Sequence, residues 1–196
     1  EIKGSGYPEG PKGRIGIAVS RSNPQVVYAL TEAASVEPGP MKFQRNPPGN
    51  GLYRSTDGGK TWQHMNTIDT RPFYYSQVRV DPKNPDRVYF SSTDLQVSND
   101  GGKTNMNAAQ SVHVDDHALW IDPNDGERWV IGMDGGIAIT YDRGGNFWYP
   151  RNLPIGQFYD VSYDYDIPYN ICSGAQDNGA WCGPTRRRTS TLNNTY

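Results

Sequence analysis

The chain has 196 residues, with 19 Lys and Arg against 21 Asp and Glu, for a net charge of −2. The absence of a basic surplus argues against nucleic-acid binding, and no apolar run reaches the roughly 18 residues of a membrane span. Hydrophobic residues make up 35% of the chain, which also contains 22 Gly, 15 Pro and 13 Tyr. This composition favours many short strands joined by turns and excludes a helical bundle.

Along the chain, one strand pattern recurs four times, with a longer first interval. Apolar stretches that end in a turn residue lie at residues 17–20, 78–81, 119–122 and 161–164. Further short strands follow each of them, and a Pro- and Gly-rich loop at residues 34–50 lengthens the first unit. Four strands in about 40–45 residues is the period of a β-propeller blade.

A turn rich in Asp and Gly precedes the last strand of the first three units. The copies read STDGGKTW from Ser55, SNDGGKTN from Ser98 and TYDRGGNF from Thr140. The first copy matches every position of the Asp-box, or bacterial neuraminidase repeat, and the second departs from it at Asn105, where Trp is expected. The residues expected to build these turns are Ser55, Asp57, Gly59, Thr61, Trp62, Ser98, Asp100, Gly102, Asp142 and Gly144.

With these motifs the chain resembles Asp-box β-propellers of the sortilin and xyloglucanase types, which also occur in large bacterial secreted proteins. Residues 71–75, 113–117 and 176–179 look like that bacterial group. In these families the Asp-box lies at the blade periphery, which implies a structural role. The resemblance implies an all-β propeller fragment of about four four-stranded antiparallel blades, at residues 14–70, 71–112, 113–153 and 154–196.

The ends of the sequence predict a fragment of a longer chain. Glu1 is not a start Met, and residues 191–196 do not resemble a natural stop. We expect the remaining blades to belong to the same parent chain or to a partner chain. The resemblance implies a parent protein that is secreted, periplasmic or displayed at the cell surface.

Propeller geometry groups the crossings between blades and the turns between second and third strands on one face, opposite the Asp-box turns. Polar and aromatic residues concentrate there, as a ligand face at the mouth of the channel requires. The expected ligand-binding residues are Arg71, Tyr74, Tyr75, His113, His117, Gln176 and Asn178.

One group on this face, His113-x-Asp115-x-His117, has the alternation that points side chains to one side of a strand. Such side chains can converge on a cation. The competing interpretation is that these polar side chains form hydrogen bonds within the crossing between blades and have no ligand. Because only one such group exists, the sequence predicts no metal and no cofactor.

Four aspartates of this face could supply a carboxylate pair, Asp115, Asp116, Asp134 and Asp177, and the candidates for catalysis are Asp115, Asp134 and Asp177. A glycosidase needs two carboxylates about 5–9.5 Å apart, but Asp is also common in turns for structural reasons. A sialidase-like site would also need a cluster of arginines for the substrate carboxylate; Arg71 is one candidate, but no matching set is visible. The leading hypothesis is a non-catalytic extracellular binding or scaffold propeller that recognises a protein, peptide or glycan. A glycoside hydrolase and a surface-assembly or filament protein are the alternatives.

Cys172 and Cys182 flank the turn signal Asp177-Asn178-Gly179, and each lies five residues from Asp177. A hairpin there places the two cysteines opposite each other. A cross-strand disulfide would fit an oxidising compartment, and a pair of reduced strand cysteines is the alternative.

Overall fold

The computed structural model describes residues 5–33, 49–150, 152–153 and 155–186. Within these ranges every regular element is a β-strand, and no helix is long and apolar enough to cross a membrane. The chain forms two compact units, Glu1–Pro150 and Arg151–Tyr196. Nearly all of the long loop predicted at residues 34–50 lies outside the described residues.

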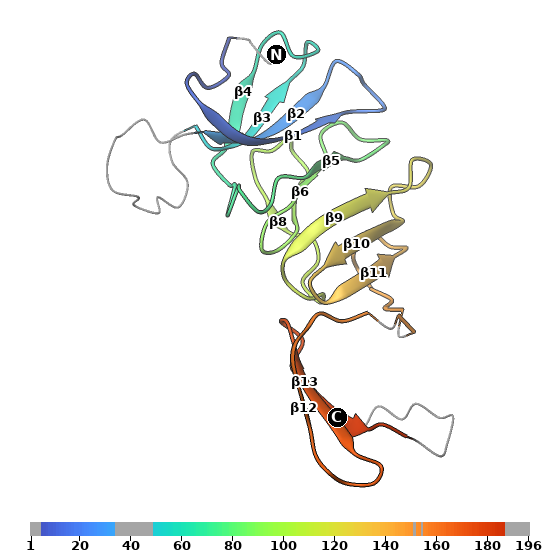
Figure 1. The fold of residues 1–196 in the computed structure, drawn as a ribbon. Coiled ribbons are helices and arrows are strands. Elements are labelled where there is room, and N and C mark those ends of the chain that lie inside the picture. Colours follow the sequence, from blue (N-terminus) through green and yellow to red (C-terminus); the bar gives the residue numbers. More distant parts are fainter. Residues whose placement is uncertain (1–4, 34–48, 151, 154, 187–196) are drawn as a thin grey trace. The chain divides into compact units, whose positions relative to one another are not determined.

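The first unit contains three antiparallel sheets that follow one another in chain order (Figure 1). The strands of the first sheet are β1 (Lys12–Val19), β2 (Val27–Ala33), β3 (Gly51–Ser55) and β4 (Gln63–Asn66). Those of the second are β5 (Val78–Val80), β6 (Val88–Phe90), β7 (Gln96–Ser98) and β8 (Met106–Asn107). Those of the third are β9 (Asp116–Ile121), β10 (Trp129–Met133) and β11 (Gly136–Thr140). The second unit is one sheet of β12 (Phe158–Tyr163), β13 (Asn170–Ala175) and β14 (Ala180–Pro184).

The described sheets confirm the all-β prediction, but only two of the four have four strands. In the third sheet, Trp148 forms a single bridge to Ile139 in place of a fourth strand. Pro150 follows closely and has no N–H to donate to a longer ladder. In the second unit the described residues end at Arg186, two residues after β14.

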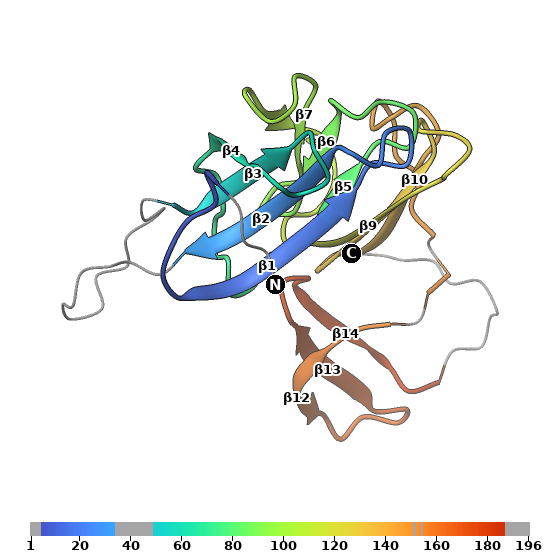
Figure 2. The ribbon, with the colours of Figure 1, turned by 90° about the horizontal axis from the view of Figure 1, so that it is seen from above.

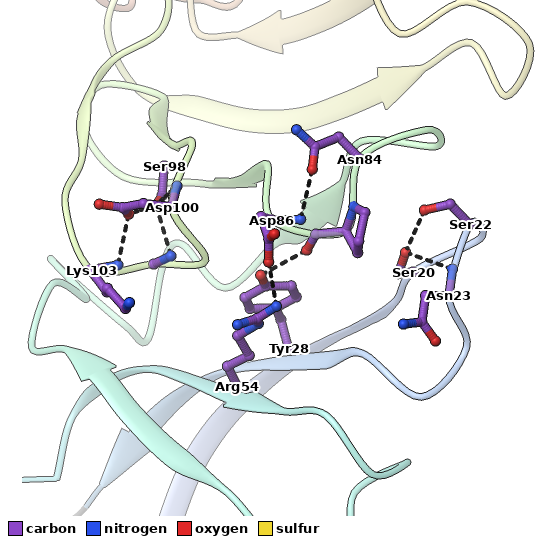
Figure 3. Close-up of polar contacts among 12 residues, drawn as sticks. Ser20, Ser22, Asn23, Tyr28, Arg54, Asn84, Asp86, Ser98, Asp100 and Lys103 are labelled. Carbon is purple, nitrogen blue, oxygen red and sulfur yellow. Dashed lines mark hydrogen bonds and ion pairs between the residues drawn. The ribbon is translucent and has the colours of Figure 1, made fainter.

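The turn residue that ends each first strand fixes the chain reversal that follows it. The Oδ1 atom of Asp81 accepts the backbone N–H groups of Lys83 and Asn84 at 2.9 and 3.1 Å. Asp122 and Asp164 make the equivalent bonds in the third and fourth sheets. Ser20 does the same for Asn23 in the first sheet (Figure 3). A carboxylate or hydroxyl that caps nearby N–H groups is the usual way for these residues to hold a turn.

Successive sheets of the first unit pack through apolar faces, and their first strands β1, β5 and β9 lie side by side (Figure 2). Alternation along β6 sends Val88 and Phe90 toward the first sheet and Tyr89 toward the third. The core between the first two sheets contains Tyr28, Leu30, Leu52, Val78, Val88 and Phe90. The core between the second and third contains Tyr89, Leu95, Val97, Leu119, Trp129, Ile131, Met133 and Ala138.

The Asp-rich turns form one repeated hydrogen-bond pattern between the third strand and the next. The Ser98 hydroxyl donates to Asp100 and accepts the Gly102 N–H at 2.7 Å. The carboxylate of Asp100 accepts the N–H groups of Lys103 and Thr104 at 3.0 and 2.9 Å and the Thr104 hydroxyl at 2.7 Å (Figure 3). Because these donors favour the charged form, they lower the pKa of the carboxyl.

The other two turns keep this pattern. In the first turn the same bonds run from Ser55 and Thr61, and the N–H and hydroxyl of Thr61 lower the pKa of Asp57 to about 2. In the third turn, the Thr140 hydroxyl takes the place of Ser, and the Asn146 amide donates to Asp142 at 2.6 Å where a Thr hydroxyl stands elsewhere. The weakly matching third copy therefore makes the same turn with different residues.

An ion pair ties the first sheet to the second beside these turns. The guanidinium of Arg54 on β3 bonds the carboxylate of Asp86, and Tyr28 on β2 donates its hydroxyl to the carbonyl of Pro85 at 2.8 Å (Figure 3). The contacts place the reversal between β5 and β6 against the first sheet. Together with the apolar core between them, these contacts hold the first and second sheets together.

Candidate functional site

Residues 67–77, which cross from β4 to β5, carry three of the predicted ligand-binding residues. The backbone turns at Arg71, whose φ is 52°, and the Arg71 carbonyl accepts the N–H groups of Tyr74 and Tyr75 at 2.8 and 2.9 Å. Arg14 on β1 donates to the Tyr74 carbonyl at 3.3 Å. The first sheet therefore helps to position both tyrosines.

Tyr75 links this crossing to the next one. Its side chain is buried, and its hydroxyl donates to the carboxylate of Asp115, just before β9. Burial, followed by the hydrogen bond to Asp115, raises the pKa of Tyr75. Asp115 has a φ of 64°, a left-handed conformation that is uncommon outside glycine.

His117 on β9 joins the same group. Its ring lies edge-on to Tyr74, with centroids 4.6 Å apart, and 5.3 Å from the ring of Tyr75. Its Nε2 atom is 3.1 Å from the Oδ1 atom of Asp134, in the turn between β10 and β11. Side chains from two crossings and one turn thus meet, as expected from the propeller arrangement.

We call this group the crossing cluster. Its members are Phe73, Tyr74, Tyr75, Asp115, His117 and Asp134. Within it, Phe73 is 61% exposed and Tyr74 is 41% exposed. Exposed aromatic rings beside carboxylates offer both apolar contact and hydrogen-bond acceptors to a ligand. The backbone strain at Arg71 and Asp115 is also typical of functional sites.

The convergence that the spacing of His113, Asp115 and His117 allows differs from what the structure shows. β9 begins only at Asp116, and the left-handed Asp115 interrupts the alternation on which that expectation rested. The Nδ1 atom of His113 lies 2.9 Å from the carbonyl of Val114, while Asp115 and His117 have different partners. Among the described residues, no group of three or more His, Cys, Asp or Glu side chains is arranged to hold a metal ion.

Two buried aspartates lie near this face, Asp116, which the sequence places in the crossing before β9, and Asp69, which sequence reasoning missed. Asp116 accepts the Leu95 N–H at 2.6 Å, and Asp69 lies in the crossing from β4 to β5. They are 2% and 4% exposed. Burial raises the pKa of both carboxyls to about 7, with the charge of Glu32 adding to the effect at Asp69. Their spacing in the sequence gives no signal for this, because burial depends on packing between sheets.

The remaining candidates, Gln176, Asp177 and Asn178, form the turn between β13 and β14 in the second unit. The N–H of Gln176 donates to Gln157 at 2.9 Å, and the side chain of Asn178 donates to the Gln176 carbonyl at 2.7 Å. Asp177 has a φ of 55°, as a tight hairpin turn requires. These residues and the crossing cluster belong to different units.

The two cysteines are directly opposite each other on β13 and β14, and a disulfide joins them. Their Cα atoms are 4.1 Å apart. Since Cys182 is exposed to solvent, the bond is open to reductants.

Reducing this disulfide should destabilise the second unit by about 2–3 kcal/mol, because the bond limits the unfolded chain. Peptide mapping without reductant should recover the linked pair. Thermal unfolding of the Cys172→Ser/Cys182→Ser variant should match that of the reduced protein. Two free thiols in protein isolated without reductant would contradict the pairing.

Comparisons with known proteins give structural neighbours but no family. Neither family models nor curated proteins produced a match. A GH74 enzyme from Niastella koreensis superposes with a TM-score of 0.53 at 17% identity, over 87% of this chain and 28% of that one. An ancestral GH74 enzyme gives 0.50 at 14% identity, over 93% and 23%. The GH74 xyloglucanase from Xanthomonas campestris gives 0.49 at 15% identity, over 85% and 28%.

The described sheets are blades of a β-propeller. The likeness extends to the fold alone, because the identities are below 20%. The chain spans only about a quarter of the length of these neighbours, 23–28%. It therefore corresponds to part of a larger propeller in those proteins.

Proposed function

We propose that this chain is part of an extracellular binding or scaffold propeller whose crossing cluster recognises a protein, peptide or glycan without converting it. The observation that carries the proposal is the exposed ring of Tyr74, which contacts the rings of both Tyr75 and His117. Those two side chains contact the carboxylates of Asp115 and Asp134, and the neighbouring Phe73 is also exposed. The left-handed residues Arg71 and Asp115 support it, since strain of this kind is retained where position matters.

The partners of the two carboxylates favour binding over catalysis. Asp115 accepts a hydrogen bond from the buried Tyr75 hydroxyl, and Asp134 is held by His117. A glycosidase acid needs a raised pKa and a second carboxylate across the scissile bond. The aspartates with a pKa near 7, Asp69 and Asp116, are buried and face the interior.

Binding tests should use a glycan array, a peptide library and a polysaccharide-hydrolysis screen with the chain and its variants. We expect a ligand whose affinity falls about ten-fold or more in Phe73→Ala and Tyr74→Ala, because exposed aromatic anchors dominate such sites. Met106→Ala is the control, since Met106 is 59% exposed on β8, outside the cluster. Equal losses in all three variants would contradict the assignment.

The alternative function is a glycoside hydrolase, which the GH74 neighbours bring into consideration through their fold. It predicts reducing-end release that disappears in Asp115→Asn or Asp134→Asn. Such release would replace the binding proposal with a catalytic one. Binding that survives without turnover would retain the proposal.

The assembly part of the proposal rests on an exposed apolar face of the third sheet. Trp120, Tyr141 and Trp148 are 48%, 63% and 57% exposed there, and the register places Val130 between Trp120 and Ile139. The second sheet buries both of its faces against neighbouring sheets, and the segment of residues 5–9 covers part of the outer face of the first sheet. We infer that further blades, from the parent or a partner chain, cover this face in a secreted, periplasmic or surface-displayed protein of the Asp-box type. Solubility should improve in Trp148→Ser if the face is exposed in isolation.

A further inference from the structure

The outer face of the first sheet, opposite the second sheet, is covered by the segment of residues 5–9. We propose that this face is a binding site for an extended peptide in which Tyr follows Gly, and that the chain fills it with its own residues. The site is separate from the crossing cluster. Its existence does not depend on the proposed function.

Tyr7 is the anchor of this segment. Its side chain is 8% exposed and inserts between Tyr53 on β3 and Trp62, with ring centroids 5.2 and 5.3 Å away. Its hydroxyl lies 2.7 Å from the Thr31 hydroxyl on β2. Val27 and Ala29 complete the buried cluster. The slot therefore fits a phenol: aromatic walls take the ring, and one buried hydroxyl takes the OH group.

The backbone of the segment docks beside the first Asp-rich turn. The Trp62 N–H donates to the Ser5 carbonyl at 2.8 Å, and Ser5 forms a parallel bridge with Thr61. Gly6 approaches so closely that a Cβ atom there would lie 2.0 Å from the Trp62 carbonyl oxygen. Main-chain pairing gives affinity and side-chain pockets give specificity when a peptide adds to a sheet in this way. The site therefore selects Gly-Tyr.

The walls of the slot are held without the segment. The Trp62 Nε1–H donates to the Gly59 carbonyl at 3.0 Å, the Tyr53 hydroxyl donates to the Gly49 carbonyl at 2.8 Å, and Tyr53 stacks on His64 at 4.5 Å. Between the segment and β1, Gly10 has a φ of 82° and no neighbouring atom within 4 Å of a Cβ position. The Gly10 carbonyl accepts the Lys12 ammonium at 2.9 Å, and among the described contacts of Gly10 only this exposed one has to break when the segment leaves the slot.

The occupant that fits in trans is the same segment of a second copy of this chain, because its sequence is the one that the structure shows in the slot. In the wild-type chain the attached segment competes at a high effective concentration, on the order of millimolar, and excludes other peptides. Removing the tyrosine anchor should free the slot without changing its walls.

The test uses the full chain with Tyr7→Ala and, as the probe, a labelled synthetic peptide of residues 1–10, EIKGSGYPEG. We expect the peptide to bind the variant at least ten-fold more tightly than the wild type. A probe peptide with Ala in place of the tyrosine should bind at least ten-fold more weakly. A probe with Phe at that position should bind with intermediate affinity, because it keeps the ring and loses the hydroxyl contact.

A second variant guards against loss of folding in the first. Gly6→Ala should expel the attached segment through the clash with Trp62 and leave the slot open to the same peptide. Circular dichroism and thermal unfolding establish that each variant is folded. The proposal is overturned when a folded variant binds no peptide, or binds the tyrosine and alanine peptides equally.

Discussion

Replacing Trp129 by Ala should lower the free energy of unfolding of the first unit by about 3–5 kcal/mol. The side chain is fully buried on β10, 5.3 Å from the ring of Tyr89 and 6.0 Å from that of Phe147. Its loss leaves a cavity between the second and third sheets that small neighbours cannot fill. Urea unfolding followed by far-UV circular dichroism gives the free energy.

Trp120 provides the matched control for this prediction. It lies on the adjacent strand β9 of the same sheet, but it is 48% exposed on the opposite face. Trp120→Ala should therefore cost less than about 1 kcal/mol. Similar losses in the two variants would show that Trp129 does not occupy the core between sheets.

Raising the pH from 4 to 8 should destabilise the first unit through Asp69 and Asp116. In the folded chain the pKa of both carboxyls is about 7, against an ordinary value of 3.8. At a pH between these two pKa values, the folded state keeps the proton that the unfolded state has released. The free energy of unfolding therefore falls as the pH rises and levels off above about pH 7. The loss of stability comes to a few kcal/mol at most, on the order of the free-energy equivalent of the pKa shift at Asp69.

Asp69→Asn should remove about half of this pH dependence, because the amide cannot ionise. Asp125→Asn is the control, since Asp125 is exposed in a turn of the third sheet. Unfolding free energies at pH 4, 6 and 8 measure the slopes. Parallel slopes in wild type and Asp69→Asn would contradict the burial of an ionisable Asp69. The turn carboxylates do not interfere, because the pKa of Asp57 and Asp100 is lowered and they act only below pH 4.

The repeat made most of the fold predictable. The blade period correctly places the Asp-rich turns and the turns at Asp81 and Asp122. These turns could be predicted because each is held by hydrogen bonds between residues close in the sequence. The fourth strand of the third sheet was predicted and is reduced to one bridge at Trp148. The segment of residues 5–9 escaped prediction, because its docking depends on a slot built by residues more than 20 positions away.

The grouping of some predicted residues on one face could be read from the sequence, and their contacts could not. Propeller geometry places Tyr74, Tyr75 and His117 on one face, and the structure brings them together. The metal-like spacing of His113 and Asp115 carried no information about their partners, because it assumed a strand where the backbone turns left-handed. Buried acids such as Asp116 follow from packing between sheets, which spacing within one sheet does not reveal.

The third Asp-rich turn has a consequence for how such repeats diverge. Thr140 and Asn146 supply the same donors and acceptors as the Ser and Thr of the other copies. The turn therefore requires a set of hydrogen-bond donors and acceptors, and more than one choice of residues supplies that set. A blade can therefore lose the residues by which the motif is recognised and still form the turn, so the repeat is easier to detect in the structure than in the sequence.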